Sequence, residues 1–362
     1  MGKKKSPLPE KYHYRYEQII QYLFLAGEIP TAIYELLGIS YDNFRKLISR
    51  FKQRNIIRTV RLDGLSGYTL TSYGKGALME DMRFVKYDGC FDVVTSDIQK
   101  RRRMQSYSNL YALFDLYGVV YEKYNLPDIN QLKVNNKKLY FYNSKDFKRG
   151  EENSDAFKGS RSYGFIAGNN KIYPIYIGNK KLPQYTNREF GYIVQLRIKY
   201  NSLSKFEHCV LFGYDIDGVS QMLKDFMNFE ENGKGKSLTE SGYYDDVIII
   251  PMVRYFKLHF WCLYNEIEIR KSIYSQLKIV NKESYVINDG FINDNEPVIF
   301  LINIAAAKLK LFLSLNRKSK IKGHIICFDY MCDTIRDLLK NDNNINIIKI
   351  DSAAIESSIG SI

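Results

Sequence analysis

The chain has 362 residues, of which 45% are hydrophobic and 14% aromatic, so it is longer than one ordinary domain and can build two hydrophobic cores. Its 53 Lys and Arg outnumber its 40 Asp and Glu, and the formal net charge of +13 favours a polyanionic partner. No apolar run reaches the roughly 18 residues of a membrane span, and residues 1–6 lack the apolar segment of a signal peptide. We therefore expect a cytoplasmic protein with two domains that does not bind a membrane.

Cysteine and histidine form no metal-binding pattern. The five cysteines, an odd number without a Cys-x-x-Cys pair, fit a reducing compartment. The four histidines lie far apart in the sequence, so we expect neither a zinc site nor a cofactor. His208 and His259 lie in apolar surroundings and are predicted to be core residues.

A winged helix-turn-helix domain is predicted for residues 11–82, after a disordered basic arm at residues 1–10. The apolar residues of 14–25 follow a helical period, which predicts a first helix. Residues 30–37 are predicted to form a short second helix that begins at a proline, a residue favoured in the first helical turn.

The third predicted helix, residues 40–54, is the most informative segment of the chain. Ser40 is a suitable N-cap, and Gly38 suits the tight turn before it. Four apolar residues recur at i, i+3, i+4 and i+7 and so share one helix face: Phe44, Leu47, Ile48 and Phe51. The other face is polar and mostly basic. This combination is typical of a helix that packs on a core and lies against DNA.

A β-hairpin is predicted after the third helix. Residues 56–62 are rich in β-branched residues, residues 63–67 are typical of a turn, and residues 68–71 are predicted to return as a second strand. Residues 72–80 are predicted to form a helix that packs back on the domain. Three helices followed by a hairpin make a winged helix.

The predicted ligand of this domain is double-stranded DNA. In a winged helix the third helix enters the major groove and the hairpin touches the adjacent backbone or minor groove. Residues 1–105 hold 19 Lys and Arg against 11 Asp and Glu, a net charge of +8 in less than a third of the chain. A protein-docking role is the alternative. Residues of the third helix that we expect to meet base edges or flanking phosphates are Asn43, Arg45, Lys46, Ser49 and Arg50, and Tyr41 is also expected to contact DNA. We expect Arg54, Arg58 and Arg61 to contact the DNA backbone, and the predicted contacts of the wing are Arg58, Arg61 and Ser66. A homodimer would read two half-sites about one helical turn apart.

A helical connector with an Arg-rich segment is predicted for residues 83–126. Arg101, Arg102 and Arg103 are expected at the start of a helix that Gly118 ends. Cations at a helix N-terminus oppose the macrodipole, so the run is not explained by helix stability. Phosphate contact is the functional interpretation, and a solvated connector is the alternative.

The first third of the chain resembles the replication-relaxation proteins of plasmids and integrative elements of Gram-positive bacteria. The resemblance rests on the predicted winged helix, an Arg-rich segment and the motif Tyr68-Thr69-Leu70-Thr71-Ser72-Tyr73-Gly74. It implies binding at an origin of plasmid replication or conjugative transfer. It also implies a restriction-endonuclease-like α/β fold for the C-terminal half.

Residues 127–362 are predicted to form an α/β domain. A hairpin of 162–166 and 171–177 precedes a helix at 187–200. Four units of a strand and a helix follow: 209–213 with 219–229, 247–251 with 255–277, 298–302 with 305–315, and 325–328 with 331–339. A last strand is predicted at 345–350. Apolar strands that alternate with helices indicate a mainly parallel sheet.

The predicted α/β domain holds only weak candidates for catalysis. An endonuclease site needs carboxylates and a lysine around a divalent metal, and Asp146-Phe147-Lys148 is the one Asp/Glu-x-Lys match in the chain. It lies in a polar stretch and not in an apolar strand, so a degenerate endonuclease-like core without a metal is favoured. Asp215 and Asp217 follow a predicted strand, where they could hold a metal or cap the next helix, and we expect capping.

Three functions follow from these expectations. The first, which we favour, is a sequence-specific DNA-binding protein of a mobile genetic element. It would act at an origin or promoter, and its α/β domain would serve in dimerisation or partner docking. The second is a metal-dependent nuclease or nicking enzyme. The third is a transcriptional regulator that senses a ligand.

Overall fold

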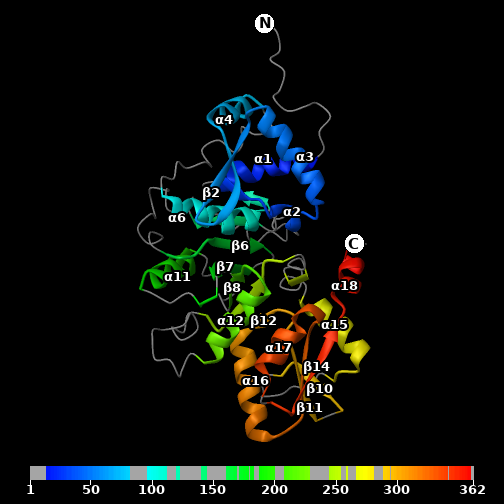
Figure 1. Cartoon of the computed structure of the whole chain (residues 1–362). Coiled ribbons are helices and arrows are strands. Elements are labelled where there is room, and N and C mark those ends of the chain that lie inside the picture. The colour runs from blue at the N-terminus through cyan, green and yellow to red at the C-terminus, as the bar shows by residue number, and fades with distance from the viewer. Residues whose placement is uncertain are drawn as a thin grey trace. The chain divides into compact units, whose positions relative to one another are not determined.

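A computed structural model of the chain has a mixed α/β fold (Figure 1). By its contacts the chain divides into two compact units, unit 1 at Met1–Gly118 and unit 2 at Val119–Ile362. The residues that the structure describes are 14–81, 96–111, 120–122, 140–144, 160–168, 171–178, 180–182, 187–199, 208–228, 244–253, 258–259, 266–280, 288–293, 295–340 and 342–359. Among these residues, none of the helices has the length and apolar character that a transmembrane segment requires.

Unit 1 combines helices with a small antiparallel sheet. Its elements are α1 (Tyr14–Ala26), β1 (Glu28–Pro30), α2 (Ile33–Leu36), α3 (Tyr41–Gln53), β2 (Ile57–Leu62), β3 (Leu65–Leu70), α4 (Ser72–Met79), α6 (Asp97–Arg102) and a π-helical turn (Arg103–Tyr107). The three strands pair in the order β1-β3-β2. The helices predicted at 14–25, 40–54 and 72–80 are confirmed as α1, α3 and α4.

The second helix begins later than the sequence predicted. Pro30 is the last residue of β1, where it pairs with Gly67 of β3, and α2 starts only at Ile33. A proline has no N–H to donate, and it is tolerated in a strand at the edge of a sheet. β1 is such an edge strand. The prediction that Pro30 opens a helix is therefore wrong, and strand β1 was not predicted.

The predicted hairpin is confirmed, but its turn is shorter than expected. Leu62 of β2 pairs directly with Leu65 of β3, so only Asp63 and Gly64 form the turn. Both have positive φ, 47° and 80°, as two-residue turns of type I′ require. Asp and Gly tolerate this conformation better than most residues. The second strand consequently begins at Leu65 and not at residue 68.

The arginine run lies inside a helical segment and not at its start. α6 begins at Asp97 and is followed directly by the π-helical turn, so Arg101, Arg102 and Arg103 lie in the interior of this segment. The prediction that the run opens a helix is wrong, because the helical segment starts before it and continues through the π-helical turn to residue 111. The predicted helix end at Gly118 lies outside the described residues.

Unit 2 contains two mixed sheets instead of the single, mainly parallel sheet that the sequence predicted. The larger sheet has seven strands in the order β12-β9-β8-β7-β6-β5-β4. Their bounds are β4 Val120–Glu122, β5 Tyr140–Asn143, β6 Gly164–Gly168, β7 Lys171–Gly178, β8 His208–Gly213, β9 Asp246–Pro251 and β12 Ile304–Ala305. β4 with β5 and β7 with β8 and β9 are parallel, whereas the β5–β6, β6–β7 and β9–β12 pairs are antiparallel.

The smaller sheet has four strands in the order β10-β11-β13-β14. Their bounds are β10 Gly290–Ile292, β11 Glu296–Phe300, β13 Gly323–Phe328 and β14 Ile345–Ile350. β11, β13 and β14 are parallel, and β10 is antiparallel to β11. The predicted strand–helix units exist, but their strands are divided between two sheets. The sequence could not predict this division, because an apolar strand pattern indicates burial but does not indicate which strands pair.

Helices cover both sheets of unit 2 (Figure 1). Their bounds are α11 Asn187–Lys199, α12 Ile216–Met227, α15 Glu266–Leu277, α16 Ala306–Ser319, α17 Cys332–Leu338 and α18 Ser352–Ile359. α11 and α12 contribute to the same apolar core as the seven-stranded sheet. On the four-stranded sheet, α16 and α17 cover one face, and α15 and α18 contribute to the core of the other.

His259 is part of the core on this second face, as the sequence predicted, whereas His208 is only partly buried. The His259 ring is fully buried between the rings of Phe328 and Tyr330, which both meet it edge to face, and its Nε2 contacts the Tyr330 hydroxyl. Burial lowers the pKa of His259 to about 4, against the smaller opposing effect of hydrogen bonds with Ile302 and Asn303. The imidazole is therefore neutral in the folded protein near pH 7.

Acidification is expected to destabilise the protein through His259. Below its ordinary pKa of about 6.5 the unfolded chain binds a proton there, but the folded chain does not until the pH nears 4, so stability is lost as the pH falls between those values. The loss from this residue is roughly 3 kcal/mol. Urea unfolding of the wild type and of His259→Gln from pH 7 to pH 4 measures it, because the variant lacks the titrating group. A difference between the two proteins that stays constant with pH would contradict the expectation.

Candidate functional site

Helix α3 forms where the sequence predicted it, and local contacts explain why. The Ser40 hydroxyl accepts a hydrogen bond from the Asn43 amide at 3.4 Å, which confirms the predicted N-cap. Gly38 has φ +59°, a left-handed conformation that glycine adopts without strain. The predicted apolar face is buried: Phe44, Leu47, Ile48 and Phe51.

Two anchors fix the orientation of α3 on unit 1. The Phe44 ring contacts the ring of Tyr34 in the α2 segment and that of Tyr68 in β3, with centroids 5.7 and 6.1 Å apart. The Phe51 ring meets Tyr16 of α1 edge to face, with centroids 5.4 Å apart. Because both ends of the apolar face are held, the opposite face of α3 is presented to solvent in a fixed orientation.

An open groove of about 400 Å³ lies on the exposed face of α3. Its lining consists of Asp42, Arg45, Lys46, Ser49, Arg50 and Gln53. All six side chains are exposed. Three cations and one carboxylate give the lining a net positive charge, and its neutral members can donate and accept hydrogen bonds. The groove can therefore attract an anion and also hydrogen-bond to polar groups.

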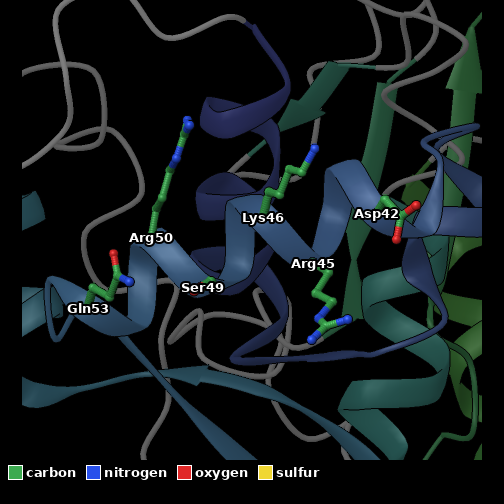
Figure 2. A pocket seen from close by; sticks show the side chains of 6 residues that line it. All are labelled: Asp42, Arg45, Lys46, Ser49, Arg50 and Gln53. Atoms are coloured by element: carbon green, nitrogen blue, oxygen red, sulfur yellow. The ribbon is translucent and has the colours of Figure 1, made fainter.

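The groove residues occupy three rows along α3. With 3.6 residues per turn, the central row at i, i+4, i+7 and i+11 is made of Asp42, Lys46, Ser49 and Gln53. Arg50 and Arg45 flank this row on opposite sides. Figure 2 shows Arg45 extending to one side of the helix, and Lys46 and Arg50 extending to the other.

Arg50 is hydrogen-bonded to a different helix. Its Nη1 donates to the Tyr16 hydroxyl of α1 at 3.0 Å. The same tyrosine contacts Phe51 through its ring, so Tyr16 touches both the exposed and the buried face of α3. α1 is thus linked to one flank of the groove through the side chain of Arg50.

Other predicted contacts of α3 lie beside the groove. Tyr41 is 52% exposed, and its ring meets Tyr34 with centroids 5.5 Å apart. Asn43 is exposed in the first turn, and Arg54 is exposed at the C-cap. They are accessible at the ends of α3 but do not belong to the groove lining.

The hairpin presents its predicted residues on two faces. Side chains alternate along a strand, and Arg61 pairs with Ser66 on the face that also holds Tyr68. That face is next to α3, since the Lys52 ammonium lies 5.1 Å from the Tyr68 ring centre. Arg61 and Ser66 are both exposed, and the Ser66 carbonyl accepts bonds from Thr31.

Arg58 lies on the opposite face of the hairpin. That face includes Gly67, where a Cβ would approach the Met104 side chain within 2.8 Å. The hairpin is therefore packed between α3 and the π-helical turn. Arg58 is exposed, but it belongs to a different surface from Arg61.

The three residues of the arginine run have different surroundings. Arg101 forms an ion pair with Asp63 in the hairpin turn, and Arg102 is exposed. Arg103 is only 4% exposed, and burial lowers the pKa of its guanidinium although the carboxylate of Glu28 opposes the shift. In this conformation the buried Arg103 guanidinium is not accessible to a phosphate, and phosphate contact by Arg101 and Arg102 stays a prediction.

Two of the four catalytic candidates, Asp146 and Lys148, lie outside the described residues. The Asp215 carboxylate accepts a hydrogen bond from the Gly218 amide at 2.6 Å and caps α12, as the sequence predicted, and Asp217 is exposed in the first turn. Within the described ranges no three His, Cys, Asp or Glu side chains gather as a metal site would need.

Replacing Asp215 tests its role as a cap. Asp215→Ala is expected to lower the free energy of unfolding by about 1 kcal/mol, and Asp215→Asn by much less, because asparagine is an equally good N-cap. Urea unfolding with and without Mg²⁺ measures both. If Asp215 were instead a metal ligand, Mg²⁺ would stabilise the wild type and this stabilisation would be lost in Asp215→Asn.

Three residues in or next to the groove were not among the predicted DNA contacts: Asp42, Gln53 and Tyr16. Asp42 lies four residues before Lys46, which places it in the central row. Tyr16 could not have been found, because its bond to Arg50 joins residues 34 positions apart. Gln53 is on the polar face that the periodicity predicted, but it was not among the predicted contacts.

Comparisons of the chain with protein-family models, with curated protein sequences and with solved structures found no match.

Proposed function

We propose that unit 1 is a winged helix-turn-helix domain that binds double-stranded DNA through the exposed face of α3, and that the protein recognises a specific DNA sequence. The observation that carries this proposal is the groove on α3, where cations flank a row of hydrogen-bonding side chains. A helix fits the major groove of B-DNA, where base edges present hydrogen-bond donors and acceptors.

The order of elements in unit 1 supports this proposal. A helix, a short strand, two helices and a two-stranded hairpin follow one another as in winged helices, and the hairpin flanks α3. Arg61 and Ser66, on the hairpin face next to α3, are therefore the proposed contacts of the wing with the DNA backbone. Arg58 lies on the other face of the hairpin and is not needed for this mode of binding.

The chemistry of the groove favours DNA over a protein partner. Arginine and lysine neutralise phosphates, which provides affinity independent of sequence. Serine, glutamine and aspartate can pair with base edges, and aspartate accepts from the N4 amino group of cytosine. A protein-docking face is commonly apolar at its centre, whereas the six residues that line this groove are all polar or charged. The resemblance to replication-relaxation proteins suggests an origin of replication or transfer as the first locus to examine.

Selection from a random duplex library with the purified full-length protein tests the proposal. We expect a recovered consensus sequence, bound with an affinity that falls steeply as salt is raised. Binding without any consensus would contradict sequence-specific recognition. No detectable binding to any duplex at low salt would overturn the proposal as a whole.

A further inference from the structure

Arg50 differs from the other cations of the groove in how it is held. All three cations line the groove, and the Arg50 guanidinium also donates to the Tyr16 hydroxyl of α1 at 3.0 Å. Tyr16 is itself fixed, because its ring is half-buried and packs edge to face on Phe51. A long flexible side chain is thereby tied to a rigid part of the unit.

This bond is not required for the packing of α3. Phe51 is 2% exposed and is held by the ring of Tyr16, which the hydroxyl does not affect. Hydrogen bonds between exposed side chains contribute little to stability, because water competes for both groups. Arg50 and Tyr16 also lie 34 residues apart, so the bond is not a by-product of helical geometry. Its clearest consequence is to fix the direction of the Arg50 side chain.

That direction leads to the flank of α3 beside α1. Asp42, Ser49 and Gln53 of the central row lie at the middle of the polar face, where base edges would lie, whereas Lys46 extends to the same side as Arg50 (Figure 2). Arg50 lies on the flank beside α1, and when α3 occupies a major groove its flanks face the sugar-phosphate strands. A guanidinium has five N–H donors in a planar fork, so it can bond the tyrosine and a phosphate oxygen at the same time.

We propose that Tyr16 is a positioning residue that holds Arg50 as a contact to the DNA backbone, so that α1 belongs to the DNA site. The inference rests on the proposed binding of duplex DNA by α3. The Tyr16–Arg50 pair increases the affinity for DNA and determines how deeply α3 enters the major groove of the duplex, but it contacts no base. Sequence discrimination then comes from the central row.

Tyr16→Phe tests this inference, since it removes the hydroxyl and keeps the ring against Phe51. Binding is measured by fluorescence anisotropy with two short duplexes, the selected consensus and a scrambled sequence of the same composition. We expect Tyr16→Phe to weaken both by a similar factor, about three- to tenfold. Arg50→Ala should weaken both by more and reduce the salt slope by about one. Tyr73→Phe is the matched control, because Tyr73 is an exposed tyrosine of α4, and it should bind like the wild type.

A double-mutant cycle separates positioning from a general structural effect. If Tyr16 acts through Arg50, adding Tyr16→Phe to Arg50→Ala causes no further loss of affinity. Equal losses in both backgrounds, an unchanged affinity of Tyr16→Phe, or a loss confined to the consensus duplex would each overturn this inference, although the wild type still binds DNA. Failure of the wild type to bind any duplex would overturn the proposed function instead.

Discussion

Replacing Arg45 with glutamate is expected to lower the affinity for duplex DNA by about 100-fold or more. Arg45 lies in the groove on the flank opposite Arg50, and its side chain is exposed. Loss of a base or phosphate contact alone costs about 1–3 kcal/mol, and the new carboxylate adds repulsion from nearby phosphates. Fluorescence anisotropy over a range of salt concentrations measures the change.

A control is needed because any charge reversal lowers the net charge of a basic protein. Lys349→Glu makes the same kind of reversal on an exposed residue of β14 in unit 2. It should change affinity much less than Arg45→Glu does, because it reduces the net charge by the same amount at a residue outside the proposed site. Equal losses in Arg45→Glu and Lys349→Glu would mean that net charge, and not the groove on α3, governs binding.

The fold of α3 could be predicted because its signals are local. The spacing of Phe44 and Phe51, the Ser40 cap and the glycine before it all lie within one stretch of the chain, and each acts through neighbouring residues. The same is true of the hairpin, where Asp63 and Gly64 fix the turn. When local preferences and burial agree, the sequence is sufficient.

The errors arose where distant residues decide the outcome. Pro30 is at a position typical of a helix start, but it lies in an edge strand, where it pairs with Gly67 of β3, 37 residues further along the chain. Arg101 to Arg103 form one basic cluster in the sequence, but in the structure Arg101 is paired with Asp63 and Arg103 is buried in unit 1. Composition identifies a charged residue, whereas only the folded contacts identify its partner.

Within the candidate site, exposure could be predicted but organisation could not. The helical period placed Arg45, Lys46 and Arg50 on the polar face, and all three line the groove. The helical period could not show that the Arg50 side chain is held beside α1, because this contact is made by Tyr16 of a different helix. It therefore could not predict that Arg50 and the central row have different roles.

Unit 2 depends on a charged cluster that the sequence did not reveal. Asp289 precedes β10, and its side chain is 4% exposed. It accepts hydrogen bonds from the Lys308 ammonium at 2.5 and 2.6 Å and from the Phe300 amide at 2.8 Å, and Arg270 forms an ion pair with it at 2.6 Å. One carboxylate therefore joins α15, α16 and the four-stranded sheet.

Asp289→Ala is expected to lower the free energy of unfolding by about 3 kcal/mol. Removing one partner of a buried ion pair typically costs 3–5 kcal/mol, and the lower end applies because Lys308 and Arg270 are 20% and 30% exposed and can turn toward water. Urea unfolding followed by circular dichroism measures the loss. Asp333→Ala is the matched control, since Asp333 pairs with Arg336 on the surface at 93% exposure and should change stability little. If both substitutions had the same small effect, the helices and the sheet would be held by apolar packing alone, and the Asp289 cluster would have no structural role.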